Sequence, residues 1–229
     1  MNRSPVRVAL IGALGRMGQT IIDVARDDED IAIVAQCDQG DSIASALEAA
    51  EVAIDFSLPE AIEEICNEST RQHRPLVIGT TGHSAEQRQL IETTAKSVPI
   101  VFASNFSVGV NALFWLTARA AAILGEKFEP QIVETHHLMK KDAPSGTAKT
   151  LAEALKKARH LDREVPIESI REGDVVGEHV VRFTGPGERL ELIHRAESRA
   201  NFAKGALMAA RWVLDKPPGL YNMQNVLGL

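Results

Sequence analysis

The chain has 229 residues, of which 45% are hydrophobic, and a formal net charge of -6. This length can bury a sizeable core in one domain or in two small ones. The acidic balance argues against a general nucleic-acid-binding protein, because the sequence has no basic stripe to neutralise phosphates. The longest helical apolar stretch, residues 112–124, is interrupted by Arg119 and is too short to span a membrane, so we expect no membrane partner.

Cysteine usage and the N-terminus favour a cytoplasmic protein. Cys37 and Cys66 show no metal or redox spacing and lie in apolar patterns, so we expect buried structural thiols. Free thiols suit a reducing compartment. The apolar run at residues 8–14 is too brief for a signal peptide and lacks a small-residue cleavage site. We therefore expect a cytoplasmic location.

The first apolar run, residues 6–11, is rich in β-branched side chains and predicts a buried parallel strand. A glycine turn follows it directly, and a helical pattern comes next; the turn reads Gly12-Ala13-Leu14-Gly15-Arg16-Met17-Gly18. Glycine permits the tight turn and lets a pyrophosphate approach the backbone at a helix N-terminus. The spacing places Leu14 where the usual fingerprint has its second glycine. In this strand–turn–helix context, the turn predicts a dinucleotide site.

A second strand, residues 31–37, leads to Asp38, twenty residues after Gly18. A carboxylate at that position can accept hydrogen bonds from the adenosine ribose hydroxyls, and it repels a 2′-phosphate. Gln39 supplies no positive charge, so Arg16 is the one evident cation that can compensate. The sequence therefore predicts a preference for NADH, with NADPH as a possible second cofactor.

Strands and helices continue to alternate up to about residue 107. Strands are expected at 52–56, 76–79 and 100–103, and helices around 44–50, 59–70 and 85–97. The pattern predicts a Rossmann-like, doubly wound parallel sheet of the α/β class. Such sheets bind ligands at the carboxyl ends of their strands. The loops at those ends supply the remaining predicted cofactor-binding residues, which are Gly79, Thr80, Thr81, Ala103, Ser104, Asn105 and Phe106.

The pattern changes after residue 107. A long helix and a strand at 130–134 are expected first, then a helix after residue 145, strands near 167–171, 178–183 and 189–194, and a last helix at about 202–214. The late strands alternate apolar and polar residues, which predicts an open, partly antiparallel sheet. We expect a dinucleotide-binding domain at 1–107, to which residues 203–229 return. Residues 108–202 are predicted to form a second, α+β domain for substrate binding and oligomerisation, with an open mixed sheet.

The segment 134–147 reads Glu-Thr-His-His-Leu-Met-Lys-Lys-Asp-Ala-Pro-Ser-Gly-Thr. Pro144 disfavours helix at the residue before it, and Ser145 is a good N-cap. The first free N–H groups of the helix would lie near Gly146 and Thr147 and would attract an anion. The segment predicts a site for an anion that undergoes protonation. A solvated loop is the alternative; a metal site is not expected, because adjacent histidines point apart and no third histidine or cysteine lies at ligand spacing.

The glycine turn and the 134–147 segment together resemble the dihydrodipicolinate reductases of the diaminopimelate and lysine pathway, also described as 4-hydroxy-tetrahydrodipicolinate reductases. The family patterns are approximately G-x-x-G-x-M-G and E-x-H-H-x-x-K-x-D-A-P-S-G-T-A, and this chain carries both. The resemblance covers nearly the whole chain and includes Ile54-Asp55-Phe56-Ser57, Gly79-Thr80-Thr81-Gly82, Asn105-Phe106-Ser107-Val108-Gly109-Val110-Asn111 and His194-Arg195-Ala196-Glu197-Ser198-Arg199. Between Asp38 and Val52 the chain is short where family members often have an insertion.

The resemblance implies an NAD(P)H-dependent reduction of 4-hydroxy-tetrahydrodipicolinate to tetrahydrodipicolinate with loss of water. It implies that His136 donates or accepts a proton and that Lys140 donates one. His137, Gly146 and Thr147 would bind the substrate. A homotetramer in which the second-domain sheets pack between subunits is also implied. Family members that use both nucleotides commonly have arginine where this chain has Gln39.

Other polar residues are expected to have supporting roles. Asp142 is expected to orient the loop or Lys140. Four histidines lack charged neighbours that suggest chemistry and are expected to be structural: His73, His83, His160 and His179. The family-like segments leave open whether His194, Arg199, Phe202 and Glu134 take part in binding or chemistry.

Two alternatives remain at this stage. The first is another two-domain nicotinamide dehydrogenase that acts on an amino acid or a semialdehyde. An aldehyde-phosphorylating enzyme would need a nucleophilic thiol, and Cys66 in a helical pattern is a poor candidate. The second is a regulator that binds NAD(H) without turnover, for which nothing in the chain is basic enough to form a DNA-binding output module.

Overall fold

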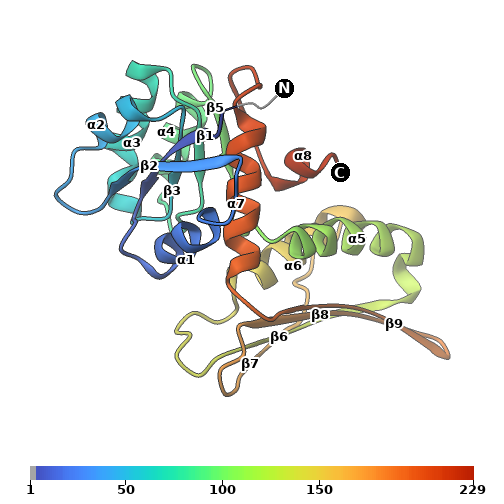
Figure 1. Cartoon of the computed structure of the whole chain (residues 1–229). Coiled ribbons are helices and arrows are strands. Elements are labelled where there is room, and N and C mark those ends of the chain that lie inside the picture. Colours follow the sequence, from blue (N-terminus) through green and yellow to red (C-terminus); the bar gives the residue numbers. More distant parts are fainter. Residues whose placement is uncertain (1–3) are drawn as a thin grey trace. The chain divides into compact units, whose positions relative to one another are not determined.

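The structure is a computed structural model that describes residues 4–229, and the chain divides into two compact units (Figure 1). The first unit contains the chain up to Ser107 together with Ala200–Leu229, and the second is Val108–Arg199. The chain crosses back at Ala200 because helix α7 (Ala200–Val213) begins there. The helix therefore starts two residues before the position expected from the sequence.

The first unit is built on a six-stranded parallel sheet with the order β10-β5-β4-β3-β1-β2. Its strands are β1 (Val6–Ile11), β2 (Ile31–Cys37), β3 (Val52–Asp55), β4 (Leu76–Ile78), β5 (Pro99–Phe102) and β10 (Gly219–Tyr221). The doubly wound parallel sheet is confirmed. Strand β10 was not expected, because three residues are too few to show a periodic pattern.

Helices cover both faces of this sheet. They are α1 (Arg16–Ala25), α2 (Ile43–Ala49), α3 (Ile62–Gln72) after the 3-10 turn η1 (Pro59–Ala61), α4 (Ala85–Thr94), α7 and α8 (Met223–Leu227). One core lies between the sheet and helices α1 and α7, and a second between the sheet and helices α2, α3 and α4. Both faces of the strands are thus apolar, which explains the continuous hydrophobic runs in the sequence.

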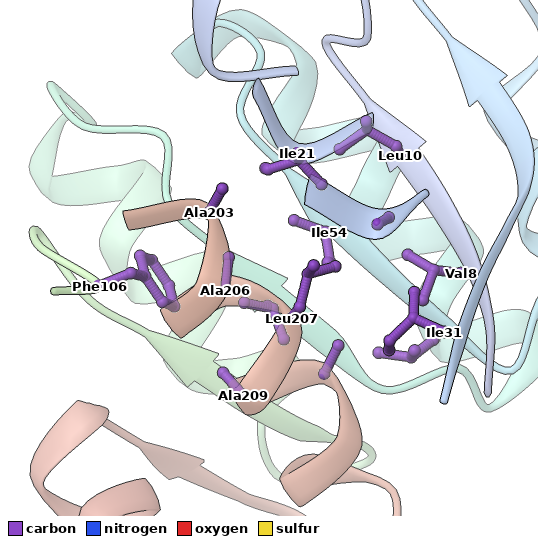
Figure 2. Close-up of a cluster of buried hydrophobic side chains, with 14 of the residues drawn as sticks. Val8, Leu10, Ile21, Ile31, Ile54, Phe106, Ala203, Ala206, Leu207 and Ala209 are labelled. Atoms are coloured by element: carbon purple, nitrogen blue, oxygen red, sulfur yellow. The ribbon is translucent and has the colours of Figure 1, made fainter. Parts of the chain in front are cut away.

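Helix α7 lies close to the sheet because its inward face is made of small side chains. Figure 2 shows Ala203 and Ala206 of α7 beside Leu207, directed toward the apolar side chains of the strands. Gly205 allows the closest approach, since a Cβ atom there would lie 1.8 Å from the carbonyl oxygen of Phe106. Gly205 therefore fixes the distance between α7 and the loop that follows β5.

The second unit is built on a four-stranded sheet with the order β7-β6-β8-β9. Its strands are β6 (Glu129–His136), β7 (Ile167–Arg171), β8 (Gly177–Gly185) and β9 (Glu188–Ala196); β6 and β7 are parallel and the other pairs are antiparallel. Helices α5 (Val108–Leu124), which continues into the 3-10 turn η2 (Gly125–Lys127), and α6 (Gly146–Arg159) pack on one face (Figure 1). The mixed sheet expected from the sequence is confirmed.

The opposite face of this sheet is not covered by any helix or strand of the second unit. Register shows which side chains point there: Val133 lies opposite Val180, which lies opposite Ile193. Ile193 is 55% exposed. Ion pairs Arg182–Glu191 and Arg195–Glu178 flank this apolar strip. We call it the open face.

Helix α5 corrects one expectation. Together with η2 it forms a helical stretch of 20 residues, Val108–Lys127, that is largely apolar. It is the one helix among residues 4–229 that is long and apolar enough to cross a membrane. Core helices of soluble proteins pass the same test. Helix α5 packs on α6 and β9 and buries Asn111 and Thr117, and 33% of its most apolar window is buried.

Candidate active site

The glycine turn between β1 and α1 is built by close backbone contacts. Gly12 has a φ of +80°, and a Cβ atom there would lie 2.4 Å from the carbonyl oxygen of Phe56. A Cβ atom at Gly18 would lie 2.2 Å from the carbonyl oxygen of Gly12. Gly15 is the N-cap of α1 and has no side chain to occupy the helix N-terminus. The turn can therefore hold an anion against the first backbone N–H groups of α1.

Asp38 lies beside this turn and is tied to it. Its Oδ2 accepts a hydrogen bond from the backbone N–H of Leu14 (2.9 Å), and its Oδ1 accepts one from that of Gln39 (2.9 Å). These backbone hydrogen bonds lower the pKa of Asp38 below its ordinary value. The side chain is therefore an ionised acceptor fixed at the mouth of the turn.

A cavity of about 430 Å³ opens between the glycine turn and the ends of β2 and β3. Gly12, Gly15 and Asp38 line it, together with Phe56 and Ser57. Its size and the glycine cradle suit the adenosine half of a dinucleotide. The residues that line the cavity therefore fit a dinucleotide cofactor.

The other predicted cofactor-binding residues follow β4 and β5 at the same edge of the sheet. Gly79 packs on the ring of Phe56, where a Cβ atom would lie 2.3 Å from Cζ. The rings of Phe56 and Phe106 are 5.6 Å apart, between centroids. Phe56 thus brings together the two predicted loops, Gly79-Thr80-Thr81 and Ala103-Ser104-Asn105-Phe106. The carboxyl ends of the central strands converge as the sequence predicted.

The second group of predicted residues lies in the second unit. His136 is the last residue of β6 and is buried, so it belongs to the strand and not to the loop where we expected it. His137 and Lys140 follow and are half-buried. Ser145 is the N-cap of α6, as predicted, and its hydroxyl accepts a hydrogen bond from the N–H of Ala148 (3.2 Å).

The N-terminus of α6 presents a short polar surface. Gly146 is exposed, and a Cβ atom there would meet no other atom within 4 Å, so open space lies in front of the backbone. Thr147 is buried in the first turn. Lys140 Nζ lies 2.8 Å from Asp142 Oδ1, the contact expected for a carboxylate that orients this lysine. The arrangement could offer the Lys140 ammonium group and helix N–H groups to an anionic ligand.

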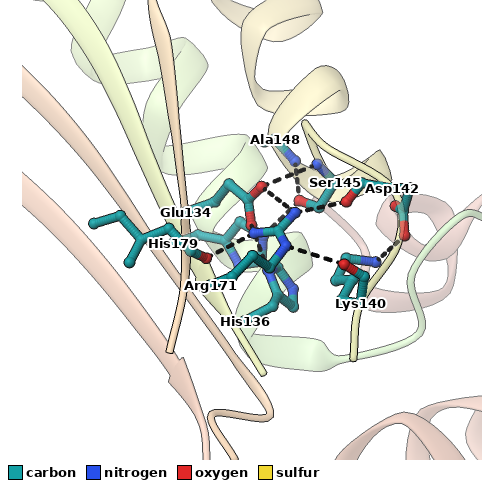
Figure 3. A network of polar contacts seen from close by, with 9 residues as sticks. Glu134, His136, Lys140, Asp142, Ser145, Ala148, Arg171 and His179 are labelled. Atoms are coloured by element: carbon teal, nitrogen blue, oxygen red, sulfur yellow. Dashed lines mark hydrogen bonds and ion pairs between the residues drawn. The ribbon is translucent and has the colours of Figure 1, made fainter. Parts of the chain in front are cut away.

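Glu134 is fully buried and forms the centre of a polar network (Figure 3). Its carboxylate accepts a hydrogen bond from Nδ1 of His136, two from Arg171 and one from the backbone N–H of Ser145. Arg171 was missed by sequence reasoning. It lies at the end of β7, directly opposite His136 in the sheet register.

His179 was expected to be structural, yet it adjoins the same network. Its ring lies 5.2 Å from that of His136, between centroids, and its Nε2 lies 3.1 Å from the hydroxyl of Ser145. Burial, with a smaller effect from His136, lowers the pKa of His179 to about 3. The ring is therefore neutral at ordinary pH and adds no positive charge beside His136.

Comparison with known proteins decides the family. Residues 6–106 match the family model described as dihydrodipicolinate reductase, N-terminus, and residues 109–227 match the model for its C-terminus. The chain belongs to the dihydrodipicolinate reductase family. The two matched segments share their boundary with the two structural units near residue 107.

Relatives within the dihydrodipicolinate reductase family match over their whole length. The 4-hydroxy-tetrahydrodipicolinate reductase of Akkermansia muciniphila is 46% identical, and the match covers 98% of each chain. That of Stenotrophomonas maltophilia is 45% identical over 99% of this chain and all of the relative. A dipicolinate-bound dihydrodipicolinate reductase from Paenisporosarcina sp. TG-14 has the same fold, with a TM-score of 0.80, 24% identity and coverage of 96% and 99%.

The thiols do not supply an alternative chemistry. Cys66 is fully buried in α3, and burial raises its pKa above the ordinary value. Cys37 is buried at the end of β2, and burial with nearby carboxylates raises its pKa too. Because the thiolate is the nucleophilic form, neither residue suits the thiol chemistry of an aldehyde-phosphorylating dehydrogenase.

Proposed function

We propose that this protein reduces 4-hydroxy-tetrahydrodipicolinate to tetrahydrodipicolinate with loss of water, using NAD(P)H, in diaminopimelate and lysine biosynthesis. The observation that carries the proposal is the match of both halves of the chain to the reductase family. Relatives with 45% and 46% identity over the full length carry the same reductase name. The glycine turn of the first unit and the histidine–lysine site of the second supply the two parts that such a reaction needs.

The cofactor is held by the first unit. The glycine turn binds the pyrophosphate, Asp38 binds the adenosine ribose, and the loops after β4 and β5 bind the nicotinamide half. Bound NAD(P)H supplies the hydride. The residues assigned to this site are Gly12, Ala13, Leu14, Gly15, Arg16, Met17, Asp38, Gly79, Thr80, Thr81, Ala103, Ser104, Asn105 and Phe106.

The substrate is held by the second unit. We assign one carboxylate of the ring to the N-terminus of α6, where the backbone of Gly146 and the backbone and hydroxyl of Thr147 are donors. His137 contributes a further contact. Lys140 and His136 carry the proton that balances the negative charge on the ring after reduction. Histidine suits proton transfer because its unperturbed pKa is close to neutral.

A coupled assay tests the proposed activity. The substrate is made freshly in the cuvette, and oxidation of NADH and of NADPH is followed in separate reactions. We expect nucleotide oxidation that requires both the protein and the substrate. A protein that binds NADH but never oxidises it with this substrate would contradict the proposal and would favour a nucleotide-sensing role.

We also propose that NADH is the preferred cofactor. Four carboxylates line the cavity beside the glycine turn: Asp38, Asp41, Glu60 and Glu64. No lysine or arginine is among the described residues that line it. Arg16 follows the lining residue Gly15 but is exposed, so solvent weakens its effect on these carboxylates. A 2′-phosphate would enter a field of like charge, whereas a ribose hydroxyl would not.

The nucleotide preference is measured as the ratio of kcat/KM for NADH and NADPH. We expect the wild type to favour NADH or to use both about equally. In Gln39→Arg the ratio should shift toward NADPH by roughly tenfold, because one charge-assisted contact to a phosphate contributes on the order of 1.4 kcal/mol. Gln89→Arg on the exposed face of α4 adds the same charge outside the cavity and should leave the ratio unchanged. A wild type that favours NADPH tenfold would defeat this proposal.

The open face of the second unit supports a homotetramer. A sheet with one uncovered apolar strip at Val133, Val180 and Ile193 is typically covered by a second subunit. We propose that the open faces pack together in solution.

We also propose a cytoplasmic location. Nucleic acid and membranes are not proposed as partners.

Light scattering measures the assembly directly. We expect a tetramer at micromolar concentration, and Ile193→Lys should dissociate it because a charge would be buried in the contact. Ile123→Lys on α5 is the matched control: this isoleucine is 82% exposed on the other side of the sheet, so the tetramer should persist. A wild-type monomer would contradict the proposal.

A further inference from the structure

The buried carboxylate of Glu134 is held by an arginine from the neighbouring strand. Arg171 makes a bidentate contact: Nη2 lies 3.0 Å from Oε1, and Nη1 lies 3.1 Å from Oε2. Glu134 has no solvent exposure, so this pairing keeps a charged group stable in the interior. Burial raises the pKa of Glu134, but hydrogen bonds, above all from Arg171, outweigh that effect and leave it below its ordinary value.

The same guanidinium also holds the loop that carries Lys140. Its Nη2 donates to the carbonyl oxygen of Asp142 (2.6 Å), and its Nε donates to that of Lys140 (3.3 Å). Glu134 completes the connection by accepting from the backbone N–H of Ser145 at the start of α6 (3.3 Å). One ion pair therefore links the end of β6, the loop and the N-terminus of the substrate-binding helix (Figure 3).

The contact with His136 determines which nitrogen can react. An ionised carboxylate only accepts hydrogen bonds, so Nδ1 of His136 must carry the proton that faces Glu134. Nε2 is then the nitrogen that gains or loses a proton. It lies beside Gly177, where a Cβ atom would come within 3.1 Å of Nε2, so glycine at the start of β8 keeps that edge of the ring free of a side chain.

We infer that Glu134 and Arg171 are positioning residues of the reduction: Arg171 keeps Glu134 ionised, and Glu134 fixes the tautomer and orientation of His136. This inference rests on the proposed function. It assigns no contact with substrate to either residue. The bidentate geometry explains why arginine, and not lysine, would be needed at position 171, because only a guanidinium reaches the carboxylate and two carbonyl groups at once.

A purely structural ion pair is the competing explanation, and it makes a different prediction. If the pair only stabilises the sheet, removing both charges together should restore the fold and the turnover. Replacing both partners of a buried pair by neutral side chains of similar size is often tolerated, whereas removing one partner leaves an uncompensated charge. The double variant Glu134→Gln/Arg171→Met therefore separates positioning from stability.

The pH dependence of turnover gives a readout that a structural role would not change. The charged and titratable groups around His136 are Glu134 on β6, Arg171 on β7, His179 on β8 and Lys140 in the loop. Burial lowers the pKa of His136, and the Glu134 carboxylate opposes part of that effect. Without the carboxylate the pKa of His136 should fall further, whether the ring acts as proton donor or acceptor.

The experiment uses the full-length protein with four variants: Glu134→Gln, Arg171→Lys, the double variant above, and Lys156→Met/Glu164→Gln as a control. The control removes an exposed ion pair of the same unit, in which Lys156 Nζ lies 2.6 Å from Glu164 Oε1. We expect Glu134→Gln to lower kcat by roughly 10²-fold, a size typical for loss of acid–base function. The limb of the pH profile assigned to His136 should move to lower pH, and NADH affinity should not change.

Nitrogen-15 NMR of the imidazoles supplies a readout that does not depend on activity. The His136 signals are assigned by their loss in His136→Gln. In the wild type, neutral His136 should carry its proton on Nδ1, and in Glu134→Gln this tautomer should lose its dominance. Arg171→Lys should lower kcat less than the double variant does, and the control should match the wild type.

Several outcomes would overturn the inference. They are wild-type turnover with an unmoved pH profile in Glu134→Gln, recovery of turnover in a folded double variant, or an Nε2–H tautomer in the wild type. An inactive wild type would instead contradict the proposed function. The tautomer measurement would still decide the geometry in that case.

Discussion

His136→Gln and Lys140→Ala are each expected to lower turnover by roughly 10²-fold or more, as loss of a general acid or base typically does. Both side chains lie where β6 meets the loop that leads to α6, the helix proposed to bind substrate. The nucleotide site is built from the other unit, so the dissociation constant for NADH should barely change. Steady-state turnover and a fluorescence titration with NADH measure the two quantities.

Thr147→Val separates binding from chemistry. It removes a hydroxyl from the first turn of α6 but leaves His136 and Lys140 in place. We expect a higher KM and weaker binding of dipicolinate, with kcat affected much less, because the lost hydrogen bond acts in the ground state and the transition state alike. Near-wild-type turnover in both His136→Gln and Lys140→Ala would contradict their assignment as proton carriers.

Gly205→Ala is expected to cause the largest loss of stability. The added methyl group would lie 1.8 Å from the carbonyl oxygen of Phe106, which is a backbone atom, so no side-chain movement can relieve the clash. Helix α7 or the loop after β5 would have to shift. We expect the free energy of unfolding to fall by roughly 3 kcal/mol or more, at the upper end of overpacking effects.

Urea unfolding measures this change, and Gly146→Ala is the matched control. Gly146 also lies in a helix, but a Cβ atom there would meet nothing within 4 Å. Its substitution should alter stability by less than about 1 kcal/mol. Because Phe106 belongs to the proposed cofactor site, a Gly205→Ala protein that still folds should also bind NADH more weakly. Equal stabilities of Gly205→Ala and the wild type would show that the contact is not tight.

Local signals in the sequence were sufficient for the parallel sheet and for the start of α6. The strand β2 has the predicted bounds, and Ser145 caps the helix, because both depend on neighbouring residues. Strand β6 was predicted to stop at residue 134 but continues to His136. The last two inward-facing residues of β6 are Glu134 and His136. Because both are polar, they break the alternation of apolar and polar residues by which a half-buried strand is recognised.

Arg171 shows why the rest of the site was not found. It is 37 residues from Glu134 in the sequence, and only the pairing of β6 with β7 brings the two side chains together. Sequence spacing carries no information about strand register between distant segments. Arg171 itself was one available signal. It is a charged residue at an inward position of the half-buried strand β7, and such a residue implies a buried partner. The contact of His179 with His136 was hidden in the same way, because the two residues lie on the paired strands β8 and β6.

The loops after β4 and β5 lie at one edge of the sheet, as expected, because parallel strands end at a common edge. The contact of Phe56 with both Gly79 and Phe106 was not predicted, since it depends on side-chain packing between loops. The sixth strand and the acidic lining of the nucleotide cavity are likewise tertiary features. NADH preference and tetramer formation remain predictions that need measurement in solution.

A single-turnover experiment tests the central claim most directly. A preformed complex of the protein with NADH is mixed with freshly made 4-hydroxy-tetrahydrodipicolinate, and nicotinamide absorbance is followed for the wild type and for His136→Gln. We predict rapid oxidation of one equivalent of NADH per subunit by the wild type and a rate roughly 10²-fold lower in the variant. Equal rates in the two proteins, or no oxidation by a wild type that binds NADH, would contradict the account.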